Sequence, residues 1–471
     1  MRPALLIPLV LFSVAAILRV HNAWVAAPMS GFDGVYHAAY VGGIYWDGYF
    51  QLPHGFTNHP PLYYSLSALV WKLVPDSASS FTALFAMRLL NVFAGLGTGA
   101  AIWASARLLF PTRPNIGYSA LALTLFVPML IGPSTVLGNQ ILSTALGAAA
   151  IALLLRCLQQ PSPRAALLAG AVAGFGVLTK MSVGIVVAVS GLALLIRGLQ
   201  LYGAKPRALS LPALFAVAAL LASSPHFVRS VTTADVPIDP LQDVWANFDR
   251  SPSDGVRPWS AYFDSNIGSI LDPASRNPRA QQAVWSNTFG ATWFDSHGTV
   301  LDTQNPDAKR LGRVLFAFGG FFSVACLIGC VVAALRRANP AVPWGLPALG
   351  VLMVVTLASY IAFTRVVPEP GALKGTYLSP GLSGFVLFAA LGLDALAGAR
   401  VRVQQALAVV LVGFVSCVTL LFWQGGIAPM KISPAVWYMR SYADPPTKRV
   451  FRYFHKGEPP GELVPLPPRR R

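Results

Sequence analysis

Long apolar segments dominate this chain, and they constrain its fold more than any other feature. Of its 471 residues, 55% are hydrophobic and only 11% are charged, whereas soluble globular proteins carry about 25% charged residues. So few charges cannot cover a water-facing surface of this size. We therefore predict an all-α polytopic integral membrane protein, much of whose surface is covered by lipid.

The apolar runs predict about eleven transmembrane helices. They lie near residues 4–21, 83–106, 116–133, 140–156, 165–179, 181–198, 209–226, 311–335, 343–363, 377–397 and 403–423. The runs 165–179 and 181–198 are predicted to be two helices, because Arg164 and Arg197 would otherwise fall on opposite sides of the membrane. Residues 1–424 then form a transmembrane domain, and residues 425–471 form a basic, proline-rich tail.

The formal net charge of +17 is spread over short loops between the apolar runs. Lys and Arg in such loops mark the cytoplasmic side and meet anionic lipid, so we expect membrane lipids and no nucleic acid as partners. The basic groups are Arg107 and Arg113, Arg156 and Arg164, Arg197 with Lys205 and Arg207, Arg336 and Arg337, and Arg400 and Arg402. With the N-terminus inside, two large loops at 22–82 and 227–310 lie outside. The same count places the basic tail outside, against the rule, so its side stays open.

Chemistry that needs a carboxylate is confined to the outer loops and to the connection 364–376, because no Asp or Glu occurs between Asp76 and Asp235. If the segment after Gly31 is helical, Asp33, His37 and Tyr40 share one face. A carboxylate just above the membrane can take a proton from an acceptor hydroxyl. The alternative is that Asp33 caps a short interfacial helix. The spacing alone does not decide between the two.

The segment Asn58-His59-Pro60-Pro61-Leu62-Tyr63-Tyr64 follows in the same loop. Its two prolines fix an extended entry to an aromatic helix, and this rigid elbow holds His59 where it can bind phosphate or a metal. Taken by itself, the segment favours a simpler interpretation, an aromatic turn at the membrane interface. The four cysteines show neither metal-ligand spacing nor a disulfide framework. No cofactor is therefore predicted, and a divalent metal stays open.

Taken together, the first-loop acid and the basic residue before Pro-Pro resemble the glycosyltransferase C superfamily, in particular the bacterial protein O-mannosyltransferases and the aminoarabinose transferases (glycosyltransferase family 39-like). Further segments resemble these proteins in the expected order. They are Leu137-Gly138-Asn139-Gln140, Gly174-Phe175-Gly176-Val177-Leu178-Thr179-Lys180, Trp285 to Asp295, and Lys374-Gly375-Thr376-Tyr377-Leu378-Ser379-Pro380. Two departures stand out: Gly34 replaces the second acid of the usual Asp-Glu pair, and Asn139-Gln140 stands where an Asp is common.

The resemblance implies a membrane glycosyltransferase that moves a sugar from a polyprenyl-phosphate-linked donor to a lipid or protein acceptor outside a bacterial plasma membrane. Asp33 would act as the general base or orient the acceptor for attack at the anomeric carbon. The leaving phosphate develops negative charge and needs cations. Lys180 is the first candidate, because a Lys among apolar neighbours is costly and usually functional; its alternative is snorkelling to the interface. The further candidates for binding substrate or phosphate are His37, His59, Arg365, Lys374 and Tyr377.

Two other functions stay in view. A transporter or flippase for a lipid-linked substrate would place ionisable groups and broken helices at mid-membrane, often in repeated halves. Here the acids avoid the spans, and no internal repeat is visible. A catalytically inactive scaffold of the same fold would explain the missing second acid.

Overall fold

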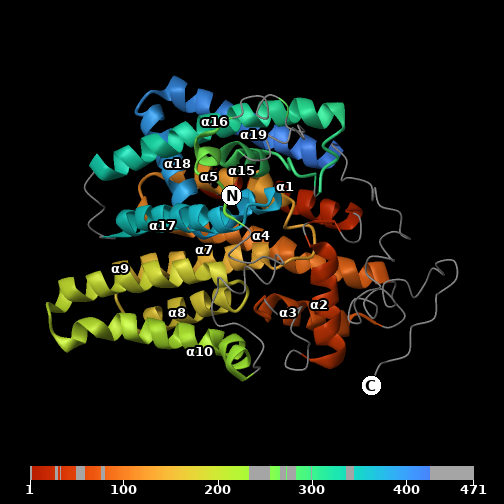
Figure 1. Ribbon diagram of the computed structural model, residues 1–471. Coiled ribbons are helices and arrows are strands. Elements are labelled where there is room, and N and C mark those ends of the chain that lie inside the picture. The colour runs from red at the N-terminus through yellow and green to blue at the C-terminus, as the bar shows by residue number, and fades with distance from the viewer. Residues whose placement is uncertain are drawn as a thin grey trace, which may run out of the picture.

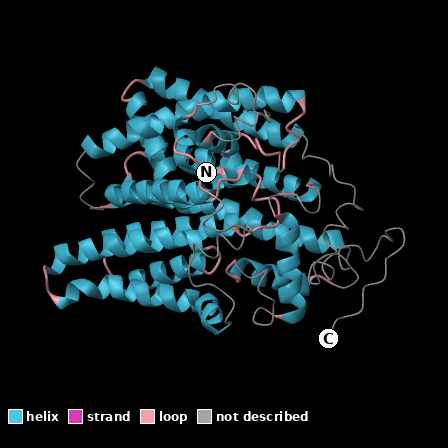
Figure 2. Ribbon diagram, in the orientation of Figure 1, coloured by secondary structure: helices cyan, strands magenta, loops and turns pink. Residues whose placement is uncertain are grey.

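The computed structural model describes residues 3–26, 30–31, 33–48, 59–75, 80–232, 255–265, 272, 283–298, 300–335 and 344–424. These residues form helices and loops, with no extended strand among them (Figure 2). The all-α prediction is confirmed. The predicted tail at 425–471 lies outside the described residues.

The long helices lie side by side in a bundle (Figure 1). They are α1 (Pro3–Val25), α4 (Ser80–Leu109), α7 (Gln140–Gln159), α9 (Gly184–Tyr202), α10 (Ser210–Thr232), α16 (Pro306–Leu335), α17 (Gly345–Val366), α18 (Leu382–Ala397) and α19 (Val401–Gln424). The shorter helices are α2 (Gly34–Asp47), α3 (Leu62–Leu73), α5 (Pro114–Phe126), α6 (Pro128–Ile131), α8 (Pro163–Val177), α12 (Ser260–Phe263) and α15 (Val284–Trp293). Single 3₁₀ turns form η3 (Met181–Val183), η4 (Pro206–Leu209) and η6 (Pro370–Ala372), and a longer one forms η7 (Gly375–Gly381).

Nine helical segments of the described part are long and apolar enough to cross a membrane. The chain is therefore a multi-pass membrane protein. The runs predicted at 116–133 and 165–179 correspond to α5 and α8, which have only 13 and 15 residues, whereas a span needs about 20. Helix α5 ends early because Val127 is extended ahead of Pro128, which begins α6. The number eleven is thus not confirmed, but the predicted division between α8 and α9 is.

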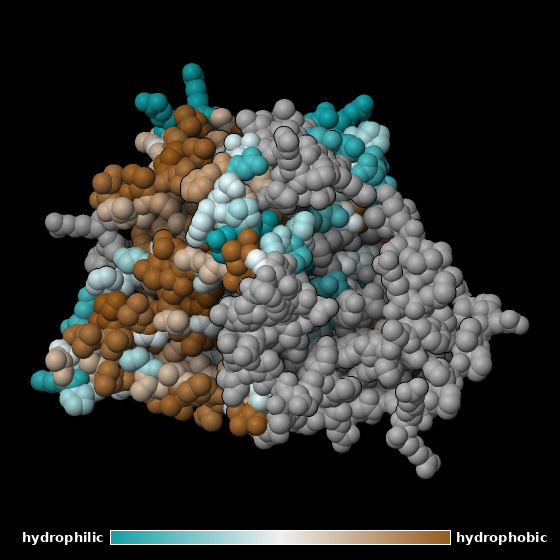
Figure 3. All heavy atoms as spheres, in the orientation of Figure 1, coloured by the Kyte–Doolittle hydropathy of each residue, from teal (hydrophilic) through white to brown (hydrophobic). Residues whose placement is uncertain are grey.

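The outer surface of the bundle is apolar. On α10, for example, Leu220 is 62% and Leu221 is 70% exposed. Brown, hydrophobic residues cover much of the helical part of the surface in Figure 3. Large side chains exposed in such numbers are unfavourable in water but suit contact with lipid.

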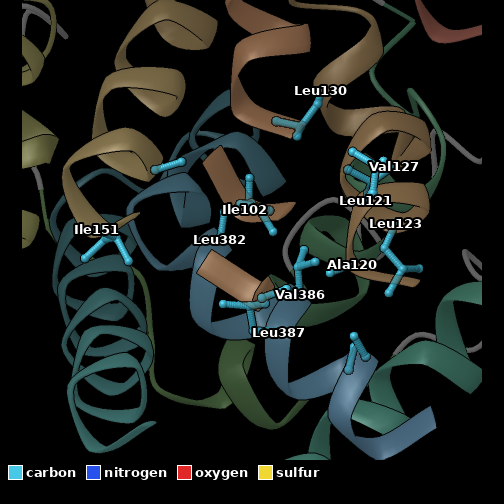
Figure 4. Packing of buried hydrophobic residues seen from close by; sticks show 14 of the residues in the cluster. Ile102, Ala120, Leu121, Leu123, Val127, Leu130, Ile151, Leu382, Val386 and Leu387 are labelled. Atoms are coloured by element: carbon cyan, nitrogen blue, oxygen red, sulfur yellow. The ribbon is translucent and has the colours of Figure 1, made fainter. Parts of the chain in front are cut away.

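Small residues bring the helices of the interior close together. Gly392 on α18 faces the backbone of Ala325 on α16, and an added Cβ would collide with the carbonyl oxygen of Ala325. Such small residues are typical of helix interfaces in membranes. A large buried apolar cluster fills the space between the helices; Figure 4 shows part of it, including Leu123 from α5 and Val386 from α18.

One end of the bundle assembles the polar residues of interest. Helix α8 ends there, and α7, α9 and α18 begin there. The two helices of the predicted first outer loop, α2 and α3, join this end, where the backbone N–H of Leu62 donates to the carbonyl of Leu178 at 3.0 Å. The start of α5 and the end of α18 lie at the opposite end, where Arg113 pairs with Asp394 at 2.6 Å.

Candidate functional site

A pocket of about 120 Å³ lies at the end of the bundle where α7, α9 and α18 begin. Six of the seven site residues predicted from the sequence line it, although they come from four separate stretches of the chain. They are Asp33, His37, His59, Lys180, Lys374 and Tyr377. The seventh, Arg365, is not among the lining residues; its guanidinium lies 4.9 Å from the centre of the Trp259 ring.

Two lysines share one aromatic ring in this pocket. The Nζ of Lys180 lies 5.2 Å from the centre of the Tyr377 ring, and the Nζ of Lys374 lies 5.7 Å from it. Both ammonium groups therefore have a cation–π partner. Burial and the neighbouring charge of Lys374 lower the pKa of Lys180 to about 8. Burial lowers the pKa of Lys374 to about 8 as well. Two buried positive charges that face one pocket form a strong attraction for an anion.

Lys180 is placed by the turn between α8 and α9. Its backbone N–H donates to the carbonyl of Gly176 at 2.9 Å, and the residue itself is extended, at the entry to η3. The loss of the helical conformation at this point turns the lysine toward the pocket instead of the lipid. The predicted Leu-Thr-Lys turn thus exists, and it fits a functional lysine better than one that snorkels along a helix.

Gln140 is a central residue of the site that the sequence did not predict. Its Oε1 accepts a hydrogen bond from Lys180 Nζ at 2.5 Å. Its Nε2 donates to the carbonyl of Thr376 at 3.0 Å and to Ser379 Oγ at 2.8 Å. One neutral carboxamide thus joins α7, the Lys180 turn and η7. The only signal in the sequence is the departure itself, since Asn139-Gln140 stands where an Asp is common in the families that the sequence resembles.

Two buried side chains, Asn91 and Tyr63, hold the loop that precedes Gln140. Asn91 on α4 donates from Nδ2 to the carbonyls of Val136 at 2.7 Å and Gly138 at 3.0 Å. The hydroxyl of Tyr63 accepts from the backbone N–H of Gly138 at 3.1 Å. These bonds satisfy polar groups that burial would otherwise make costly, and they hold the pocket wall rigid.

The surroundings of His37 favour its neutral form. Burial, together with the charges of Lys180 and Lys374, lowers the pKa of His37 to about 3. Its Nδ1 forms a 2.9 Å hydrogen bond with the hydroxyl of Tyr64. His37 can therefore bind a substrate by hydrogen bonding but not as a cation. His59 lines the same pocket, is exposed, and is held by the Tyr40 hydroxyl, which donates to its carbonyl at 2.8 Å.

Asp33 directly precedes α2 in a left-handed conformation, with φ 57° and ψ 18°. Asp tolerates this region better than most residues. Its side chain makes no capping hydrogen bond to α2 and is exposed at the pocket. This geometry does not support the alternative that Asp33 acts as a helix cap. Its negative charge acts on Lys180, where it partly offsets the lowering of the pKa.

Other acids of the outer loops have different surroundings. Asp295 accepts the backbone N–H groups of Val300 at 2.6 Å and Leu301 at 2.8 Å, so its carboxylate stabilises a loop. The described part of the chain holds no group of three or more His, Cys, Asp or Glu side chains that could bind a metal ion.

Comparisons with known proteins identify this architecture. Residues 58–228 match the family model of dolichyl-phosphate-mannose-protein mannosyltransferases. The chain matches none of the curated proteins by sequence.

Among solved structures, the oligosaccharyltransferase AglB from Archaeoglobus fulgidus, in complex with an inhibitory peptide and a dolichol-phosphate, is similar with a TM-score of 0.56 at 15% identity. The match covers 98% of this chain and 60% of that one. The same archaeal enzyme in complex with Zn and sulfate has a TM-score of 0.55 at 16% sequence identity. That match covers 98% of this chain and 57% of the archaeal chain. ArnT from Cupriavidus metallidurans, bound to undecaprenyl phosphate, has a TM-score of 0.40 at 18% sequence identity. That match covers 83% of this chain and 78% of ArnT. The chain thus spans less than two thirds of the length of the archaeal enzyme.

The family match covers α3 to α10, including the Pro-Pro elbow, Gln140 and Lys180. The likeness to the archaeal enzyme extends over nearly the whole chain and concerns the fold. The resemblance predicted from the sequence is thereby confirmed. This chain is a multi-pass membrane protein with the glycosyltransferase C fold.

Proposed function

We propose that this protein is a membrane glycosyltransferase that moves a sugar from a polyprenyl-phosphate-linked donor to a lipid or protein acceptor. The observation that carries the proposal is the pocket that holds Asp33 together with Lys180 and Lys374. A sugar phosphodiester needs cations on its leaving phosphate and a base for the attacking hydroxyl. The pocket offers both within one small volume.

The proposed roles follow from the surroundings of each residue. Lys180 and Lys374 bind the phosphate, and Tyr377 holds the two ammonium groups over its ring. Exposed Asp33 takes the proton of the acceptor hydroxyl, and neutral His37 donates or accepts a hydrogen bond. His59 contacts the substrate at the solvent-exposed edge of the pocket. We assign Arg365 no part in phosphate binding, because it does not line the pocket. That an archaeal enzyme of the same fold has been solved with a dolichol-phosphate supports a lipid phosphate as ligand.

We place the site on the outer face of a bacterial plasma membrane. The basic groups Arg107, Arg156, Arg207 and Arg400 lie at or near the ends of helices that are remote from the pocket. Loops rich in Lys and Arg stay in the cytoplasm, which puts the pocket on the other side. In the same arrangement residues 1–424 act as one catalytic membrane domain, followed by the basic tail 425–471.

The binding of a lipid phosphate tests this proposal directly. Polyprenyl phosphate should bind the purified protein, and Lys180→Ala should weaken binding by about 1.5–3 kcal/mol, the usual worth of a hydrogen bond to a charged group. Arg365→Ala, which removes a cation outside the pocket, is the matched control and should bind like the parent. Equal binding by Lys180→Ala and the parent would reduce Lys180 to an interfacial anchor. A lipid phosphate that binds and moves across the membrane without sugar transfer would favour a flippase.

A further inference from the structure

Lys374 stands on a short connection between two helices rather than on a helix. It directly precedes η7 and is extended, with φ −113° and ψ 131°. The connection, residues 367–374, joins the end of α17 to η7 and contains one 3₁₀ turn, η6. Side chains on loops are held less precisely than side chains on helices. The position of Lys374 at the pocket therefore depends on the contacts that fix this connection.

Arg257, from the predicted second outer loop, holds the beginning of the connection. The residue is only 2% exposed. Its Nε donates to the carbonyl of Thr364 at 3.0 Å, and its Nη2 donates to the carbonyls of Val367 at 3.4 Å and Glu369 at 3.1 Å. Its backbone N–H donates to the carbonyl of Arg365 at 2.9 Å. The last carbonyls of a helix lack donors within the helix, and a cation suits this end of the helix dipole. Arg257 thus caps α17 and reaches beyond it into the connection.

The bond to Glu369 fixes the part of the connection that leads to Lys374. The carbonyl of Glu369 also accepts the backbone N–H of Ala372 at 3.0 Å, within the turn η6. The next residue, Leu373, is fully buried in a small apolar cluster that includes Tyr262. Lys374 follows directly and lines the pocket. The backbone is therefore held as far as the residue before the lysine.

Tyr262 supports the same arrangement from a second position of the described segment 255–265. Its hydroxyl donates to the carbonyl of Ile361 at 3.1 Å and forms a 2.8 Å hydrogen bond with Oγ1 of Thr364. Arg257 and Tyr262 together fasten this segment to the end of α17. Neither residue lines the polar pocket, so any effect on a bound phosphate passes through a residue that does.

From these contacts we infer that Arg257 is a positioning residue, which holds the ammonium group of Lys374 at the phosphate site. The inference rests on the proposed function, because it takes Lys374 to bind the phosphate of the donor. Without the guanidinium, the end of α17 and the turn η6 lose their common donor. The connection then gains conformational freedom, and Lys374 must lose more entropy when it meets the phosphate.

A double-mutant cycle tests the inference, because residues that act through one another have non-additive effects. Arg257→Ala is made in the parent, in Lys374→Ala and in Lys180→Ala. The affinity of each purified full chain for polyprenyl phosphate is titrated, and its thermal stability is measured alongside. Arg310→Ala is the control for loss of positive charge: its side chain is 78% exposed and pairs with Asp307 in the same predicted outer loop. It should bind like the parent.

We expect Arg257→Ala to weaken binding about tenfold in the parent and in Lys180→Ala, but less than about twofold in Lys374→Ala. An equal loss in all three backgrounds would overturn the inference, since a general loss of structure or of charge does not depend on Lys374. If Arg257→Ala fails to fold, the same comparison is made with Tyr262→Phe, which removes only a hydroxyl and should show a smaller loss that also disappears in Lys374→Ala. Failure of the proposed function looks different: Lys180→Ala and Lys374→Ala would then bind the lipid phosphate as tightly as the parent.

Discussion

Gln140→Glu is the most informative change at the candidate site, because it alters the charge beside Lys180 with almost no change of shape. In the parent, the neutral Oε1 of Gln140 accepts from Lys180 Nζ at 2.5 Å. A carboxylate there would neutralise the lysine. It would also stand about 4–5 Å from a phosphate oxygen bound on the other side of the ammonium group, given a second N–H···O⁻ contact of about 2.8 Å.

The size of the effect follows from Coulomb's law. Two like charges about 4–5 Å apart repel by about 3–4 kcal/mol at an effective dielectric constant of about 20. The pocket opens to solvent at Asp33 and His59, which are exposed, so screening reduces the repulsion. We expect Gln140→Glu to lose about 2 kcal/mol of binding to polyprenyl phosphate, which is about 30-fold in Kd.

Two further variants separate charge from structure. Gln140→Met removes the hydrogen bonds to Lys180, Thr376 and Ser379 but adds no charge, so it should weaken binding less than Gln140→Glu. Gln160→Glu makes the same substitution at the exposed far end of α7 and should leave binding unchanged. The assay is titration of purified protein with polyprenyl phosphate at low and high salt. Binding by Gln140→Glu as tight as the parent's would refute the idea that a surplus of positive charge holds the phosphate.

Two more predictions concern pH and sidedness. Burial and Lys374 lower the pKa of Lys180 to about 8; an anion binds the protonated form, so polyprenyl phosphate binding should be full below pH 8 and weaken as the pH rises through 8. Burial lowers the pKa of Lys374 to about 8 as well, so Lys180→Arg, which stays charged at one of the two positions, should show a smaller fall than the parent. A pH-independent parent would contradict the role of both lysines. For sidedness, a cysteine at Ser260, near the pocket end, should react with an impermeant thiol reagent from outside intact cells, whereas a cysteine at Gln160 should not. The reverse pattern would place Asp33 in the cytoplasm.

Much of the fold was predictable because membrane helices need long apolar segments, which are visible in a single sequence. The division between α8 and α9 followed from the positions of Arg164 and Arg197. The run predicted at 116–133 is divided for a local reason: apolar residues continue through Val127 and Pro128, but the proline ends α5 there. Hydropathy does not register this break.

The candidate site was predictable as far as its residue types carry a chemical signal. Asp33 and Lys180 stand out as ionisable groups among apolar neighbours, and the structure brings them to one pocket. Gln140 carries no charge, and its role depends on contacts with Lys180 and Thr376, which are 40 and 236 positions away. Arg365 was assigned to the site for the same reason: it is close to Lys374 in sequence but lies over Trp259 in space. Tertiary packing decides which side chains come close together, and a single sequence does not show it.

The central claim is that Asp33 is the base for sugar transfer in this pocket, and a transfer assay with Asp33→Asn tests it most directly. Asn fits the left-handed backbone at this position as well as Asp does, so expression and thermal stability should stay close to the parent's. In membranes supplied with a polyprenyl-phosphate-linked sugar, loss of a general base should lower the rate by about two to four orders of magnitude. Transfer by Asp33→Asn at the rate of the parent would contradict the account.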